Sequence, residues 1–125
     1  MPEQPYEINL DVKFDQLERI DVGAEAAAVE PWFNQTLTQV NDSVVRLGVV
    51  KGEFHWHKHD DEDEFFLVLE GELHIDVEDA DTIVLGINQG VTIPRGVVHR
   101  PRAPQRTVIV MVEPATVVPT GDAAD

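Results

Sequence analysis

Short apolar segments that alternate with polar residues make up most of the chain after residue 43. They are rich in valine, isoleucine, leucine and phenylalanine, and they are 44–51, 54–59, 65–69, 73–77, 82–85, 91–93, 97–99 and 107–112. Turn-forming residues separate them, at Lys51-Gly52, Glu70-Gly71, Asn88-Gln89-Gly90, Pro94-Arg95-Gly96 and the pair Pro101 and Pro104. Short strands at regular spacing, divided by such turns, predict an all-β sandwich or barrel.

The first 43 residues give a weaker pattern. Residues 6–14 alternate and predict a strand or an extended arm, and residues 32–37 predict a further strand. The alanine-rich segment 23–29 favours one short helix, which Pro31 would end. The first five residues hold two prolines and are expected to form a loose tail.

These patterns predict a single domain in three parts. We expect residues 1–43 to form an N-terminal arm with strands that packs on the barrel or on a partner subunit. Residues 44–113 would form the barrel core, and residues 114–125 a C-terminal extension. A chain of 125 residues has the length of one domain and can bury roughly two-thirds of its unfolded surface.

The charge and the missing cysteines exclude several classes of protein. Acidic residues outnumber basic ones by 24 to 9, for a formal net charge of −15, which argues against binding to nucleic acid or to an anionic membrane. The chain has no cysteine, which excludes disulfides, thiol catalysis and cysteine-bound metals. No apolar segment approaches the roughly 18 residues of a membrane span, and residues 1–14 lack the pattern of a signal peptide, so we expect a cytoplasmic protein.

Three histidines at alternate positions are the strongest chemical feature of the sequence. On a strand, the period of two places His55, His57 and His59 on one face, where two imidazoles can bind one metal ion. A carboxylate from the next strand would complete three ligands, and such nitrogen and oxygen donors suit Fe, Mn, Co, Ni, Cu or Zn. Glu64 begins the apolar segment that follows, whereas residues 60–63 are expected to form a solvated connecting turn.

This stretch resembles the first motif of the cupin superfamily. That motif is a glycine, then His-x-His, three or four residues, a glutamate, six residues and a glycine, and it matches His57-Lys58-His59, Glu64 and Gly71. The opening glycine corresponds to Gly52, one residue closer to the first histidine than is usual, which changes the turn but no ligand.

The alternative pair of histidines, His55 and His57, fits the motif less well. It would place the acid at Glu62 and would put Leu69 where the motif has its glycine. We therefore assign the pair to His57 and His59.

A second cupin motif, Pro-x-Gly-x-x-His, is present at residues 94–99. Proline and glycine in these positions suit a type I turn that aims the next strand and its histidine, His99. Two positions depart from the family: three residues separate Gly90 from Pro94, where five are usual, and Ala103 occupies the place of a frequent asparagine.

The resemblance implies a cupin-type double-stranded β-helix, an RmlC-like jelly-roll barrel, with one divalent transition metal per chain. The implied ligands are His57, His59, Glu64 and His99. We expect His55 and Phe66 to line the pocket or to contact the ligands from behind, and His55 could instead be a fifth ligand, bind substrate or carry a proton.

The resemblance does not fix the activity, because cupins include dioxygenases, isomerases, lyases and proteins that only bind ligands. Our first hypothesis is a metal-dependent enzyme acting on a small oxygenated metabolite, and the alternative is a non-catalytic binding or sensor protein. The flanking residues, among them Trp32 and the ending 113–122, are similar to small cupins labelled phosphomannose-isomerase-like. We do not favour a sugar-phosphate isomerase, because the positions that we assign to the pocket carry no lysine or arginine.

Two surface features complete the expectations. Phe54, Trp56, Phe65, Leu67 and Leu69 are assigned to an outer face that is too apolar for water, so we expect a homodimer partner or the N-terminal arm to cover it. Four arginines lie within residues 95–106, either as an anion-binding rim or paired with the acidic turn 60–63 or with a dimer partner.

Overall fold

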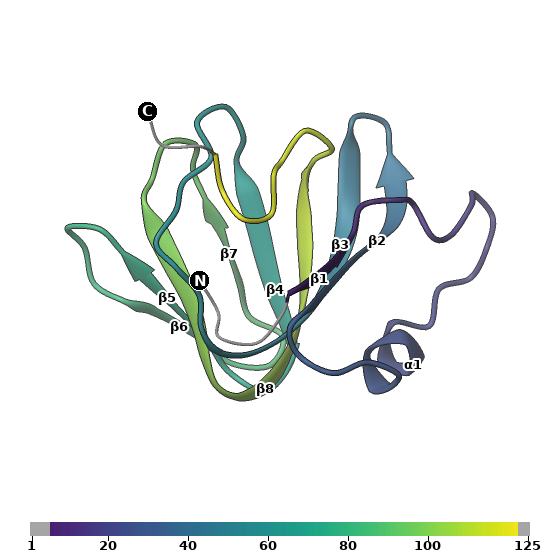
Figure 1. The fold of residues 1–125 in the computed structure, drawn as a ribbon, viewed down its shortest axis with the longest axis horizontal. Coiled ribbons are helices and arrows are strands. Elements are labelled where there is room, and N and C mark those ends of the chain that lie inside the picture. Colours follow the sequence, from purple (N-terminus) through teal and green to yellow (C-terminus); the bar gives the residue numbers. More distant parts are fainter. Residues whose placement is uncertain (1–5, 123–125) are drawn as a thin grey trace.

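The computed structural model describes residues 6–122 and confirms the all-β jelly roll with one short helix (Figure 1). In chain order the described elements are β1 (Glu7–Asn9), α1 (Val22–Ala27), β2 (Phe33–Val40), β3 (Ser43–Glu53), β4 (Glu64–Glu70), β5 (Leu73–Val77), β6 (Ile83–Leu85), β7 (Gly90–Ile93) and β8 (His99–Pro114). β1 runs parallel to β2, and the other described pairs are antiparallel. The first five residues, for which the sequence predicts a loose tail, lie outside the described part.

The 16-residue strand β8 joins the two sides of the barrel. It pairs with β3 along one edge, and with β5 and then β4 along the other. The predicted turn at Pro101 and Pro104 is wrong, because both prolines lie inside this strand. The pairing of β3 with β8 contains a bulge, in which the single residue Lys51 of β3 lies opposite three residues of β8, 104–106. Such a bulge accepts Pro104, which has no N–H to offer the ladder.

Aromatic side chains dominate one end of the barrel interior. Trp32 stacks on Phe54 with ring centres 5.4 Å apart, and the ring of Tyr6 lies edge-on, 5.6 Å from each of them. Asn34 donates a hydrogen bond from Nδ2 to Tyr6 Oη over 3.2 Å. The residue just before β1 is therefore part of the core, and the predicted strand 6–14 is regular only over Glu7–Asn9.

A second apolar layer lies between the sheet and the N-terminal segment. Along β3, Leu47 and Val49 belong to this outer layer, whereas Val50 faces the interior. The side chains that cover the layer come from residues before β2 and are Phe14, Ile20, Val22, Ala26 and Val29. The outer face of the sheet is thus partly buried within one chain.

The helix α1 confirms the one helical segment that the sequence predicts. Asp21 caps it by accepting a hydrogen bond from the Ala24 amide over 3.0 Å, as short polar side chains do at helix starts. In Figure 1 the helix lies outside the sheet, beside β2 and β3. Within residues 6–122, no helix is both long and apolar enough to cross a membrane.

Tyr6 provides a direct test of this packing, because it is the chain's only tyrosine. Burial raises its pKa from 10.0 to about 12. The unfolded chain therefore ionises first, and the stabilisation from the neutral phenol is lost as the pH rises from 10 toward 12. We expect tyrosinate absorbance of the native protein to titrate near pH 12, and Tyr6→Phe to remove about 2–3 kcal/mol of the alkaline loss in stability.

The urea-unfolded protein is the control, and its tyrosine should titrate near the ordinary value of about 10. A native pKa equal to that of the unfolded chain would show that Tyr6 is not packed in the core.

Candidate metal centre

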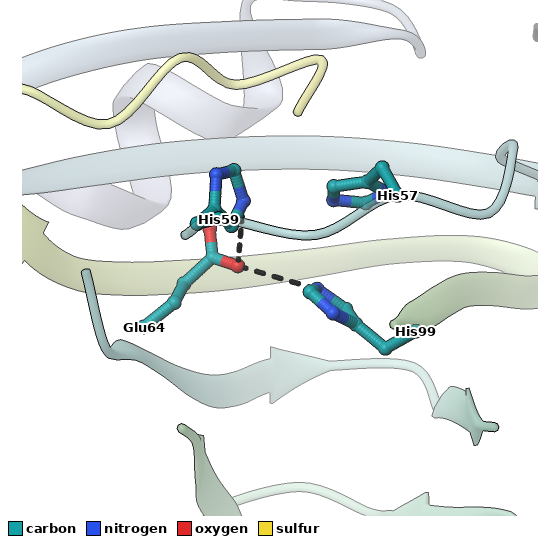
Figure 2. A group of neighbouring side chains, drawn as sticks. All are labelled: His57, His59, Glu64 and His99. Atoms are coloured by element: carbon teal, nitrogen blue, oxygen red, sulfur yellow. Dashed lines mark ion pairs between the residues drawn. The ribbon is translucent and has the colours of Figure 1, made fainter. Parts of the chain in front are cut away.

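Four side chains that the sequence analysis selects as metal ligands meet at one site. His57 and His59 lie between β3 and β4, Glu64 is the first residue of β4, and His99 is the first residue of β8. One ligand atom from each side chain lies within 4.8 Å of those of the other three. Figure 2 shows His57 and His59 on one side of the site and His99 opposite, with the Glu64 carboxylate directed at both His59 and His99.

A one-residue bulge sets the direction of His57. The Phe54 amide donates to the Pro101 carbonyl, and the His57 amide donates to the His99 carbonyl. Between these two pairs, residues 55 and 56 lie opposite the single residue Arg100, so the segment that carries His57 has one extra residue. Both Phe54 and His57 consequently line the interior cavity. The predicted strand 54–59 is reduced to an isolated bridge between His57 and His99, and the assignment of Phe54 to the outer face is wrong.

The turn of the second motif ties His99 to the segment that carries the other histidines. Gly96 has a φ of +80°, a conformation that favours glycine, and its N–H donates to the His59 carbonyl over 2.8 Å. His57 and His99 exchange two backbone hydrogen bonds of 2.9 Å. The ligand positions are therefore fixed by backbone pairing.

Backbone carbonyls also orient two of the imidazole rings. His57 Nδ1 lies 3.0 Å from the His55 carbonyl, and His99 Nδ1 lies 2.9 Å from the Val97 carbonyl. A carbonyl can only accept, so each Nδ1 carries the proton and each Nε2 presents its lone pair to the site.

The facing atoms have no hydrogen-bond partner. Among the described residues, His59 Nε2, His99 Nε2 and Glu64 Oε1 are buried and make no hydrogen bond. Each of the two nitrogens lies 3.5 Å from the glutamate oxygen. Two ligands bound tetrahedrally to one ion at about 2.1 Å are roughly 3.4 Å apart. Since an unpaired buried polar atom costs about 1–3 kcal/mol, these residues fit a divalent transition metal that would satisfy them together.

The pKa shifts of His57 and Glu64 favour the protonation states that bind metal, whereas the shift of His59 opposes metal binding. Burial, reinforced by the neighbouring His99, lowers the pKa of His57 to about 4, so this imidazole is neutral near pH 7. Burial alone would raise the pKa of Glu64, but its contacts with His59 and His99 lower the pKa below its ordinary value. Burial alone would lower the pKa of His59, but the neighbouring Glu64 outweighs this effect and raises it. A metal would therefore compete with a proton for this ring.

An interior cavity adjoins the four side chains. Its walls include His57, Glu64 and Phe66, and about 30 Å³ of it is open to the centre of a water-sized sphere. A single water needs about 10–15 Å³ on this measure, so the cavity holds a very small molecule or a few waters. Phe66 lies on the wall of this cavity, with its ring 6.4 Å from that of His99.

His55 and Glu62 lie behind the four converging side chains. His55 Nε2 lies 2.7 Å from the Thr120 carbonyl, and its ring packs on Phe54 at 4.0 Å. Glu62 accepts a hydrogen bond from Thr116 and groups with His59 and Asp122 on the outer side of the site.

The barrel interior contains a buried ion pair, Arg46 with Glu113, that the sequence did not predict. Arg46 Nη1 lies 2.8 Å from Glu113 Oε2, and the two side chains are 3% and 1% exposed. Arg46 also donates to Thr36 Oγ1 and to the Val117 carbonyl. Burial and the nearby charge of Glu64 raise the pKa of Glu113. The alternation of β3 places Arg46 on the same face as Gly48 and Val50, and Val50 faces the interior. This alternation is the one sequence pattern that could have predicted a buried Arg46.

The four clustered arginines lie outside the cavity and pair with acidic residues. Arg95 contacts Asp63, and Arg106 contacts Glu70. Arg100 and Arg102 share Asp76, which they hold in its charged form by lowering its pKa. The predicted pairing with the acidic turn 60–63 is therefore seen for Arg95, whereas the other three arginines pair with acidic residues elsewhere on the barrel.

The segment after β8 lies against the site (Figure 1, yellow). Pro119 lines the cavity beside His57, and the Asp122 amide donates to the Lys58 carbonyl over 2.9 Å. Gly121 has a φ of +95°, and a β-carbon there would lie 2.5 Å from His57 Cβ. Only glycine fits at this point of contact.

The chain belongs to the cupin domain family, whose match covers residues 43–114. This range contains both motifs and all four converging side chains.

Two relatives share substantial sequence with the chain. It is 52% identical over 80 residues to the uncharacterized protein YdbB of Bacillus subtilis strain 168, which covers 64% of this chain and 71% of that protein. The crystal structure of a cupin-2 domain containing protein from Shewanella frigidimarina NCIMB 400 is similar with a TM-score of 0.72 and 35% identity, over 76% of this chain and 93% of that one. Protein NMB1881 from Neisseria meningitidis, at 23% identity and a TM-score of 0.70 over 78% of this chain and 99% of that one, shares the fold.

The contact between Gly121 and His57 can be tested with a matched control. Gly52 has nearly the same positive φ, +93°, but nothing lies within 4 Å of the position that a β-carbon would take there. Gly52→Ala should cost about 1 kcal/mol from backbone strain alone. Gly121→Ala should cost a further 1–3 kcal/mol, roughly, because the added methyl group overlaps His57.

Urea unfolding of both variants measures the difference. Equal losses of stability in the two would mean that the C-terminal segment does not pack against His57.

Proposed function

We propose that this cupin binds one divalent transition metal per chain through His57, His59, Glu64 and His99, and a small oxygenated molecule in the adjoining cavity. The observation that carries the proposal is the set of three buried, unpaired atoms, His59 Nε2, His99 Nε2 and Glu64 Oε1, which face one another. The metal is one of Fe, Mn, Ni, Zn, Co or Cu, all of which accept imidazole and carboxylate ligands.

We further propose that the protein is an enzyme of the dioxygenase, isomerase or lyase type. A metal held by these ligands acts as a Lewis acid toward a bound oxygen atom and, if it is iron, supports oxygen chemistry. Two side chains of the cavity wall could move protons, Tyr6 and Glu113, and burial raises the pKa of both. The sequence allows a proton-transfer role for His55. We consider that role weaker than the roles of Tyr6 and Glu113, because His55 Nε2 lies 2.7 Å from the Thr120 carbonyl oxygen.

The non-catalytic alternative is a binding or sensor protein that uses the same cavity. The small size of the cavity favours it, since little room remains beside the ligand for a second reactant. A sugar-phosphate isomerase is disfavoured, because no lysine or arginine is among the described residues that line the cavity.

We also propose that the protein forms a homodimer and that it is located in the cytoplasm. The outer sheet face keeps an apolar strip that the N-terminal segment does not cover, formed by exposed Val112 and half-buried Phe65 and Leu67. A second copy of the chain would cover this strip, and sedimentation equilibrium measures whether it does.

Metal content tests the centre directly. Tag-free wild-type protein should carry about one divalent ion per chain, either as purified or after reconstitution, and the His57→Ala/His99→Ala variant should lose it, because each ligand lost weakens binding roughly 10-fold or more. His74→Ala is the matched control, since His74 pairs with Glu72 away from the site and its loss should change nothing. Elemental analysis measures all three.

Two outcomes would contradict the proposal. One is metal retained in full by the double variant, and the other is wild-type protein that takes up none of the six candidate ions. The identity of the ion then selects the assay, with iron or copper pointing to oxygen chemistry and the others to isomerase or lyase tests.

A further inference from the structure

The cavity walls are apolar except at a few positions. Trp32, Phe54, Phe66, Ile109 and Met111 supply most of the surface that a ligand would touch. Walls of this kind favour a compact ligand with a largely hydrocarbon body, while the few polar groups set its orientation.

Asn34 is the uncharged wall residue with a free acceptor oxygen, and the other free acceptors on the wall are carboxylate oxygens of Glu64 and Glu113. Its side chain is 2% exposed, its Nδ2 donates to Tyr6 Oη, and its Oδ1 is buried without a partner. The residue paired with it on β3 is Gly48, which has no side chain to supply a donor. Because an unsatisfied buried oxygen is costly, Oδ1 is positioned to accept a hydrogen bond from something that enters the cavity.

The described residues of the wall offer no cation to an anionic group away from the metal. Glu64 and Glu113 both line the cavity, and none of the described lining residues is a lysine or an arginine. Arg46 lies behind Glu113 and already has three partners. A second negative charge on the ligand would therefore find no cation.

We propose that the cavity takes a small ligand that binds the metal through one oxygen group, donates a hydroxyl hydrogen bond to Asn34 Oδ1 and carries no second negative charge. This inference rests on the proposed metal centre. It makes Asn34 the residue that determines specificity and places the ligand among small hydroxylated compounds. Phosphorylated compounds and dicarboxylates are excluded.

Three probes that differ in one group test this inference on the full chain loaded with Co²⁺. They are 3-hydroxypropionate, butyrate, which has methyl in place of the hydroxyl, and succinate, which has a carboxylate there. Dissociation constants follow from changes in the visible cobalt spectrum. Wild type should bind 3-hydroxypropionate about tenfold or more tighter than either of the others, because the hydroxyl satisfies a buried acceptor.

Asn34→Leu should reduce the affinity for 3-hydroxypropionate to that for butyrate. Asn9→Leu is the control, because Asn9 lies on β1 and bonds only Glu7 on the surface, and it should keep the wild-type preference. Cobalt content is measured in every sample. If Asn34→Leu fails to fold, the wild-type comparison of the three probes decides by itself.

Equal binding of butyrate and 3-hydroxypropionate, tightest binding of succinate, a preference unchanged in Asn34→Leu, or no spectral response to any probe would each overturn the inference. In those cases cobalt is bound and the metal centre stands. Absence of cobalt from the wild type would instead overturn the metal centre, and this inference with it.

Discussion

The whole site depends on the pairing of β8 along both of its edges. One edge continues the ladder with β3, and the other holds β5 and β4, so this strand connects the two halves of the barrel. Its first residue, His99, faces Val77 on one side and His57 on the other. The backbone positions of His57 and His99 are therefore set by hydrogen bonds of the sheet, whether or not anything is bound between their side chains.

The bulges in this pairing are as important as its regular parts. Near Pro104, extra residues on β8 let a proline remain inside a long strand. Near Phe54, an extra residue on the opposite segment turns both an aromatic ring and His57 toward the cavity. Without the second bulge, strict alternation would place Phe54 and His57 on opposite faces, and either the core or the site would lose its side chain.

Electrostatics inside the barrel explain why a cation suits this interior. Two buried carboxyl groups, Glu64 and Glu113, lie close enough to influence one another, and Arg46 is ion-paired with Glu113. His57 contributes no charge near pH 7, because burial lowers its pKa to about 4. Glu64 pairs with His59 and His99, and a cation bound among these side chains would compensate its buried charge.

The sequence predicts the fold class and the four converging side chains because both rest on local patterns. Period-two alternation marks most strands, and the two motifs give the spacing of His57, His59, Glu64 and His99. It fails at Phe54 and at Pro104, where a bulge changes the register, because a bulge has no pattern of its own in a single sequence. It also misses Tyr6, Asn34 and Glu113, which reach the cavity from residues far apart in the chain, through pairings that alternation cannot specify.

The residues that the sequence misses form part of the cavity wall beside the four converging side chains. The four converging side chains are compatible with most first-row metals and many reactions, so they cannot by themselves distinguish one cupin from another. The distinguishing features are the acceptor oxygen of Asn34, the lack of a cation among the described wall residues, and the C-terminal segment that brings Pro119 and Gly121 against His57. Each comes from a segment outside the two motifs. If the proposed metal centre and ligand are correct, specificity resides in the packing of the chain around the four converging side chains, and a change in that packing would alter the ligand without removing the metal.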